Sequence, residues 1–344
     1  MTTELKPGSR YAPLDMFKTI LAWGMILGHV ILLTSEQLGP FADATWNYIN
    51  LTSFSGFLFA FGFGVGMGRG SARPRPWRQR LLPALTMLAS TYLVGFCFET
   101  LVGKQPVTAD FLFDLLSLRV LFGYSEFLAS FFVLYLAIAV ARPLLQRLQN
   151  SIRAMFCIAI VCMSSTFLVT DAQWPLLGTL IGNTGYGTFP LIPYFPLFML
   201  GLYYAGQGRG PDLIEAAAAL AATAACLISI NNLGAWPGRF PPTKVWITGS
   251  AAFLLAYWVA SLQLADRVAW QKLVFACGRH VLACLVFSTL VLFVVHNQFG
   301  TPVSNYWLLA IASLGLIGTT TAYCLLVETV QVRLRRARAQ RAGA

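Results

Sequence analysis

Charged residues are scarce in this chain of 344 residues, since only 11% of them are Asp, Glu, Lys or Arg. A soluble domain has roughly a quarter of its residues charged. Hydrophobic residues make up 57% of the chain and aromatic residues 14%. This composition excludes an ordinary soluble protein and predicts a polytopic membrane protein. Because a helix satisfies its own backbone polar groups in lipid, we expect one all-α bundle of about ten membrane helices.

The sequence also lacks the motifs that mark several common sites. It has no CxxC pair, no P-loop, no HExxH and no Rossmann glycine fingerprint between a strand and a helix. Its seven cysteines lie in or beside apolar stretches, so we interpret them as small core residues and expect no metal. The glycine-rich stretch GFGVGMGRG (62–70) lies in an apolar segment, where small residues favour close packing of helices.

Ten apolar segments are candidates for membrane helices, which need about 20 mainly apolar residues. The fifth of them is short, and the fourth has an unusually polar start. Residues 1–13 then form an N-terminal segment without a cleavage pattern, 14–328 the membrane domain, and 329–344 a basic tail. The ten segments lie near residues 14–34, 46–68, 81–103, 115–141, 154–170, 188–206, 213–231, 244–264, 279–297 and 306–328.

The net charge of +11 comes from arginine and lysine in short segments between the apolar ones. If the N-terminus is cytoplasmic, the arginine-rich loops and the tail all lie on the cytoplasmic side, in agreement with the positive-inside rule. We therefore predict that both termini lie in the cytoplasm and that the protein resides in the cytoplasmic membrane of a bacterium. We expect no nucleic-acid partner. The basic tail fits a topology anchor or a contact with anionic lipid.

The first apolar segment, LDMFKTILAWGMILGHVILL (14–33), carries side chains that are costly inside a membrane. Lys18 and His29 are about 16 Å apart along a helix and about 20° from perfect alignment, so they share one face. Asp15 lies one turn before Lys18 and can pair with it. A cation there can bind phosphate, and a neutral imidazole can accept a proton from a hydroxyl or amine. The residues also fit a snorkelling Lys18 and a His29 that is hydrogen-bonded to a neighbouring helix.

This segment resembles the first helix of the transmembrane acyltransferase superfamily, which includes the acyltransferase-3 proteins, the glucan-succinylating enzymes and the heparan-α-glucosaminide N-acetyltransferase-like proteins. The family pattern reads Leu-Asp, then Arg with Gly, then an apolar run to His, with ten residues between the Arg and the His. Residues 19–28 separate Lys18 from His29 here, so the spacing matches. The chain departs from the pattern in having Lys18 in place of Arg and Thr19 where Gly is common. Lysine keeps the charge but loses the bidentate contact that arginine makes with phosphate.

Later segments resemble the family in the same order, so the resemblance covers most of the chain. It implies an acyltransferase that moves an acyl group, commonly acetyl, from cytoplasmic acyl-CoA to a glycan or lipid-linked glycan outside, with no other cofactor. His29 is implied as the base or a transient acyl carrier. Lys18 is implied as a contact for the phosphates of the donor, and Arg279 as a second such contact or an interface anchor. The segments are LTSFSGFLFAFGFGVGMGRG (51–70), YSEFLASFFVLYLAIAVARPLL (124–145), YGTFPLIPYFPLFMLGLYYAG (186–206) and FACGRHVLACLVFSTLVLFVVHN (275–297).

A second group of charged residues marks the start of the fourth predicted span. Glu126 follows Arg119 by seven residues, so we expect both on one helix face. Two interpretations remain open. In the first they line an acceptor site, or Glu126 is a catalytic residue that orients His29 through its ring N–H. In the second they form a structural ion pair that offsets the cost of its own burial. His296, at the outer end of the ninth span, is predicted either to meet the acceptor or to be exposed near the headgroups.

Two other functions fit the same residues. Histidine, glutamate and arginine inside the membrane could serve a proton-coupled transporter. The lysine at position 18 also fits a relative without catalytic activity that assists the assembly of other membrane proteins.

Overall fold

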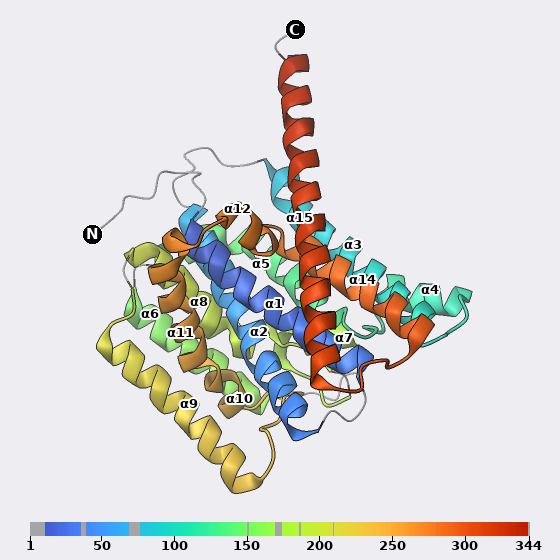
Figure 1. Ribbon diagram of the computed structural model, residues 1–344. Helices are drawn as coiled ribbons and strands as arrows, with labels where there is room; N and C mark the ends of the chain where they lie inside the picture. Colours follow the sequence, from blue (N-terminus) through green and yellow to red (C-terminus); the bar gives the residue numbers. More distant parts are fainter. Residues whose placement is uncertain are drawn as a thin grey trace. The chain divides into compact units, whose positions relative to one another are not determined.

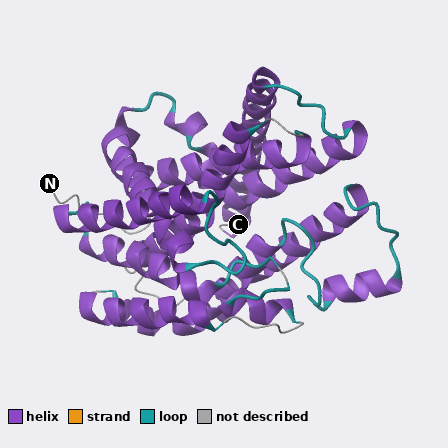
Figure 2. Ribbon diagram, turned by 90° about the horizontal axis from the view of Figure 1, so that it is seen from below, coloured by secondary structure: helices purple, strands orange, loops and turns teal. Residues whose placement is uncertain are grey.

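The computed structural model describes residues 11–35, 39–68, 76–149, 151–168, 174–185, 187–208 and 210–342. These residues form helices joined by loops, with two isolated bridges and no β-strand in the described ranges (Figure 2). The all-α polytopic fold expected from composition is confirmed. Within the described residues the chain divides into two compact units. Unit 1 comprises residues 50–259, and unit 2 comprises 11–49 and 260–342.

Unit 2 is built around the first helix, α1, which packs against α13, α14 and α15 (Figure 1). Apolar side chains are buried along its whole length, from Leu14 and Phe17 to Val30 and Leu33. The helices of this unit are α1 (Ala12–Thr34), the start of α2 (Pro40–Met67), the 3₁₀ turn η3 (Ala265–Arg267), α12 (Gln271–Val274), α13 (Ala276–Arg279), α14 (Val281–Phe299) and α15 (Tyr306–Ala342).

Helix α1 runs parallel to the chain segment formed by α13 and α14. Near its start, the hydroxyl of Thr19 accepts a hydrogen bond of 3.1 Å from the backbone N–H of Gly278. Near its end, the carbonyl of Leu33 accepts a bond of 2.7 Å from His296. Gly278 permits the first contact, because a Cβ at that position would lie only 2.0 Å from the carbonyl oxygen of Asp15. Residues at the start of α1 and at α13 therefore lie at the same end of unit 2.

Helix α15 is longer than a membrane span requires. The part that is apolar enough to cross a membrane covers Tyr306–Leu334, and the helix continues to Ala342. Its start is held by an edge-to-face contact of 5.7 Å between the rings of Tyr306 and Phe41. Its last turns extend beyond the other helices of unit 2 (Figure 1). The basic tail predicted from residue 329 is thus the helical continuation of the last span.

Unit 1 contains the rest of the chain, and the division between the units falls within α2 and within α11. Its helices, besides the main part of α2, are α3 (Trp77–Leu101), α4 (Ala109–Leu116), α5 (Glu126–Leu148), α6 (Ile152–Ser164), the 3₁₀ turn η2 (Ser165–Phe167), α7 (Pro175–Ile181), α8 (Leu191–Gln207), α9 (Leu213–Leu233), α10 (Lys244–Gly249) and α11 (Ala251–Leu264).

Small residues allow α2 and α8 to approach closely inside unit 1. A Cβ added at Gly62 would lie 1.9 Å from the carbonyl oxygen of Phe198, and one at Gly201 would lie 2.0 Å from that of Phe59. The packing role predicted for the glycine-rich stretch is borne out at Gly62. Aromatic rings fill the space on either side, and the ring of Phe54 alone contacts four others: Phe127, Phe131, Phe189 and Tyr194.

The predicted spans correspond to helices, with differences in length. Eight helices of the described ranges are long and apolar enough to cross a membrane, while the spans predicted at 154–170 and 188–206 correspond to shorter helices. The start of the fourth prediction, 115–141, was wrong. Helix α4 ends at Leu116 and α5 begins only at Glu126, because the backbone between them turns through left-handed conformations at Leu118 and Tyr124.

Candidate functional site

The cation at the start of α1 is paired but still accessible. The Nζ atom of Lys18 lies 2.8 Å from a carboxylate oxygen of Asp15, one turn earlier on the same helix. The two side chains are 22% and 13% exposed, so the pair lies at the edge of the packed interior. An ammonium group has three N–H donors, and one ion pair leaves the others available for a second anion.

A second cation lies at the same end of unit 2 but is held differently. The guanidinium of Arg279 contacts the carboxylate of Glu328, on α15, at 2.9 Å, and the two side chains are 7% and 16% exposed. It also donates to the carbonyls of Gln271 and Lys272. His280 lies 3.9 Å from the same carboxylate. Arg279 therefore ties α12, α13 and α15 together, and its ion pair is more buried than that of Lys18.

The imidazole of His29 lies farther along α1, where it meets α14. Its Nδ1 is 3.3 Å from the hydroxyl oxygen of Thr289, and Thr289 is buried. His29 itself is half-buried. In a neutral ring whose Nδ1–H donates to this hydroxyl, Nε2 is the basic nitrogen. The contact fixes the ring by a neutral partner, without a carboxylate in that hydrogen bond.

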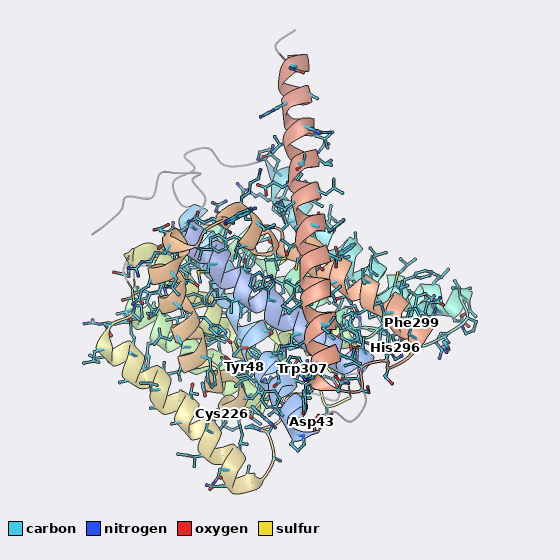
Figure 3. The ribbon with its side chains drawn as sticks, viewed as in Figure 1. Asp43, Tyr48, Cys226, His296, Phe299 and Trp307 are labelled. Atoms are coloured by element: carbon cyan, nitrogen blue, oxygen red, sulfur yellow. The ribbon has the colours of Figure 1, made fainter. Side chains whose placement is uncertain are left out.

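His296 lies two turns beyond Thr289 on α14, near the C-terminal end of that helix, where Figure 3 labels it together with Phe299. Its Nδ1 bonds the backbone carbonyl of Leu33 at 2.7 Å. A carbonyl can only accept a hydrogen bond, so Nδ1 carries the proton and Nε2 is the basic nitrogen of the neutral ring. Because α1 and α14 are parallel, this histidine lies at the opposite end of α1 from Lys18.

Comparison with known proteins shows the family to which this chain belongs. A family model described as an acyltransferase domain, that of the acyltransferase-3 proteins, matches residues 11–328. The chain belongs to this family. No curated protein and no solved structure matches it significantly. The match starts next to α1 and includes every candidate site residue, so the protein is an integral membrane acyltransferase.

Unit 1 of the acyltransferase contains a separate charged cluster around Glu126, the first residue of α5. The Oε2 atom of Glu126 is buried and has no hydrogen-bond partner in the described part of the chain. The carboxyl group of Glu126 interacts electrostatically with the positive charge of Arg239, which lies in the loop between α9 and α10. The guanidinium of Arg239 lies 5.3 Å and 4.5 Å from the ring centres of Phe189 and Phe240. This half-buried cation is thus held between aromatic faces, near an acid.

Burial and charge act in opposite directions on this cluster of the acyltransferase. Burial lowers the pKa of Arg239, while the neighbouring Glu126, Tyr194 and Tyr124 raise it. Burial also raises the pKa of Tyr124, and Glu126 raises it further, against the charge of Arg239. Tyr124 therefore keeps its phenolic proton at neutral pH, and the hydroxyl, carboxyl and guanidinium groups of the cluster are close enough to act on one another electrostatically.

The shared helix face predicted for Arg119 and Glu126 in this acyltransferase was wrong. Arg119 is exposed, lies in the turn after α4, and stacks over the ring of Phe113 at 4.9 Å. It cannot share a helix face with Glu126, because the helix is interrupted between them. The role predicted for Glu126 as the orienting partner of His29 stays a prediction, since the two residues belong to different units.

Several residues of the acyltransferase site were not predicted from the sequence. Thr289 and Glu328 each lie within a long apolar segment, and no spacing on one helix connects them with α1 or α13. Glu328 had a weak signal, because it is an acid near the end of the last span. Arg239 also had a weak signal in the sequence, because it is a cation in a loop that has few others. Outside this site, Cys277 and Cys284 meet Cys324, which lies on another helix 40 positions beyond Cys284 in the chain.

Proposed function

We propose that this acyltransferase moves an acyl group, acetyl in the simplest case, from cytoplasmic acyl-CoA to a hydroxyl or amine of an extracytoplasmic glycan. The observation that supports the proposal is the arrangement of α1. It presents an accessible ammonium near one end and, about 16 Å along the helix, an imidazole with an orienting partner. The parallel course of α13 and α14 places Arg279 level with the ammonium and His296 beyond the imidazole.

Lys18 is the residue that we assign to the phosphates of the donor. Its ammonium is more exposed than the guanidinium of Arg279, and Asp15 is its ion-pair partner. Arg279 already contacts Glu328 and two carbonyls. Its contribution to donor binding is therefore to fix α13 against α12 and α15, and to add positive charge at the end of unit 2 where Lys18 lies.

His29 is the base in this proposal. Its Nε2 takes the proton from the acceptor hydroxyl or amine while the acceptor oxygen or nitrogen attacks the thioester carbonyl. The carbon–sulfur bond then breaks, and the CoA thiolate leaves and takes up the proton from the imidazolium. Thr289 contacts Nδ1 of the ring, and in the tautomer that carries its proton on Nδ1 the basic nitrogen is Nε2.

The acceptor lies, in this proposal, toward the opposite end of α1 from Lys18. His296 is there, with Nε2 available to a sugar hydroxyl. Considered by itself, unit 1 offers a second candidate for contact with a sugar, because the cluster of Glu126, Arg239 and Tyr124 combines polar groups with aromatic faces. Arg119, an exposed cation outside α5, is a further candidate for contact with the acceptor. This scheme places both termini in the cytoplasm and the protein in a bacterial cytoplasmic membrane.

Substituting Thr289 by valine is expected to reduce kcat by about 3- to 10-fold, which corresponds to one neutral hydrogen bond. Valine keeps the shape of threonine but leaves Nδ1 of His29 without this partner. The KM for acyl-CoA should stay the same, because Thr289 contacts His29, which lies about 16 Å from Lys18 along α1. Serine at this position should restore most of the rate. A loss of stability without a change in kcat would contradict a positioning role.

Substituting Lys18 by alanine is expected to raise the KM for acyl-CoA by about 10- to 100-fold, the range for one hydrogen bond to a charged group. Arginine at this position, the residue of the family pattern, should lower the KM below that of the natural chain, because it can contact phosphate through two N–H groups. The exposed Lys272 in the same unit provides the control, and Lys272→Ala should leave the KM unchanged.

Incubation of membranes with acetyl-CoA labelled in the acetyl group tests the proposal as a whole. We expect label in covalent linkage to an envelope glycan, dependent on His29 and Lys18. Label that enters the far compartment without becoming covalently attached would favour a transporter instead. Absence of both, together with no binding of acetyl-CoA, would identify a non-catalytic assembly partner.

A further inference from the structure

Three cysteines of unit 2 meet inside the helical packing. Cys277 lies on α13, Cys284 on α14 and Cys324 on α15, and their sulfur atoms all lie within 4.8 Å of one another. Each of the three residues is 0% exposed. All three are free thiols. The other four cysteines of the chain, at positions 97, 157, 162 and 226, belong to unit 1.

Packing alone accounts for burial but not for this convergence. A cysteine in an apolar core behaves as a small hydrophobic residue, and its S–H group is a weak donor. Here three such groups point at one another from three separate helices. The remaining contact is between Cys277 and Thr321, whose sulfur and hydroxyl oxygen are 3.5 Å apart. The indole N–H of Trp23 is buried near Cys277 and has no hydrogen-bond partner in the described residues. If Cys277 became a thiolate, its sulfur could accept a hydrogen bond from this N–H.

We propose that Cys277, Cys284 and Cys324 form a binding site for a soft, thiophilic metal ion, and that this ion is Cu(I). A metal about 2.3 Å from each of three sulfurs holds them about 4 Å apart, so the observed cluster needs to contract by less than about 1 Å. The helix that carries Cys277, α13, is already tied to the helices on either side of it. The bond from Gly278 to Thr19 anchors α13 to α1, and the ion pair of Arg279 with Glu328 anchors α13 to α15.

The donor set favours Cu(I) over Zn(II). Zinc in structural sites takes four ligands in a tetrahedron. The described residues place three sulfurs together with no histidine or carboxylate as a fourth member of the group. Soft thiolates select Cu(I), which is stable with two or three of them. On binding, copper–sulfur bonds replace S–H bonds, and the released protons leave to water. The positive charge of Arg279 acts on Cys324 and offsets part of the negative charge that remains.

The spacing rule used on the sequence could not find this site. It looks for ligands that are near one another in the chain, whereas these three come from three helices and span residues 277–324. The absence of a CxxC pair therefore does not exclude the site. It also stands apart from the proposed acyl transfer, because none of the three cysteines has a role in that reaction.

Anaerobic titration of the purified full-length chain in detergent tests the site, with Cu(I) supplied from a chromophoric chelator that competes for it. We expect one Cu(I) per chain, and an X-ray absorption spectrum with a first shell of sulfur only. Two variants form a matched pair. The chain with serine at positions 97, 157, 162 and 226 should bind like the natural chain. The chain with serine at 277, 284 and 324 should bind at least 100-fold more weakly.

A single substitution keeps the test valid if the triple variant does not fold. Cys324→Ser removes one donor, and its affinity for Cu(I) should fall at least 10-fold while its melting temperature stays close to that of the natural chain. Equal binding by the two variants of the matched pair would overturn the site. A parallel titration with Zn(II) addresses the choice of metal. One equivalent of zinc held as tightly through the same three cysteines would overturn the assignment to Cu(I).

Discussion

Substitution of His29 by alanine is expected to reduce acyl transfer by about 100- to 10,000-fold, the usual contribution of a general base. In the proposed reaction the imidazole is the proton acceptor, and its Nδ1 lies 3.3 Å from the hydroxyl of Thr289. The loss should appear in kcat, and the KM for acyl-CoA should change little, because Lys18, about three turns earlier on α1, is untouched. Transfer of labelled acetyl groups by the purified protein measures both constants.

Two further variants separate the base from its surroundings. Glutamine at position 29 keeps an amide N–H for Thr289 but has no basic nitrogen, so it should be as inactive as alanine. Leu32→Ala changes an exposed side chain three residues later on the same helix, and its activity should be that of the natural chain. Activity of His29→Gln close to the natural level would show that the ring has only a structural role.

Substitution of Arg279 by alanine should cost about 3–5 kcal/mol of unfolding free energy, the range measured when one partner of a buried ion pair is removed. The variant leaves the carboxylate of Glu328 without its 2.9 Å partner, and both side chains are mostly buried. The carbonyls of Gln271 and Lys272 lose a donor as well. Denaturant-induced unfolding in detergent measures the cost, and Arg267→Ala, an exposed arginine in the same unit, should cost less than about 0.5 kcal/mol.

A double-mutant cycle shows whether the cost belongs to the pair. Arg279→Leu and Glu328→Leu should each destabilise strongly, whereas the double variant should recover much of the loss, because no uncompensated charge remains. The KM for acyl-CoA of the double variant reports on donor binding separately. Additive losses in the double variant would contradict a direct ion pair between the two residues.

The sequence was most informative about α1. Its apolar character and length predicted the helix, and the periodicity of a helix placed Lys18 with Asp15, which the structure confirms at 2.8 Å. The family resemblance rested on the same stretch and is confirmed by a match over residues 11–328. These features could be predicted because they depend on residues that are neighbours along one helix.

Contacts between helices could not be predicted in the same way. The partners of His29 and Arg279 come from α14 and α15, about 260 and 49 positions away in the chain. Sequence periodicity gives the direction of a side chain on its own helix, but not the helix that faces it. The interruption between α4 and α5 was missed for another reason. It depends on left-handed backbone at Leu118 and Tyr124, which are residue types that rarely adopt it.

The central claim is that α1 binds the donor with Lys18 and activates the acceptor with His29. Calorimetric titration of acetyl-CoA into the purified natural chain, Lys18→Ala and His29→Ala tests it most directly. The account predicts that His29→Ala binds acetyl-CoA as tightly as the natural chain, whereas Lys18→Ala binds it at least 10-fold more weakly. Equal affinity in all three proteins, or an equal loss in both variants, would contradict the division of roles along this helix.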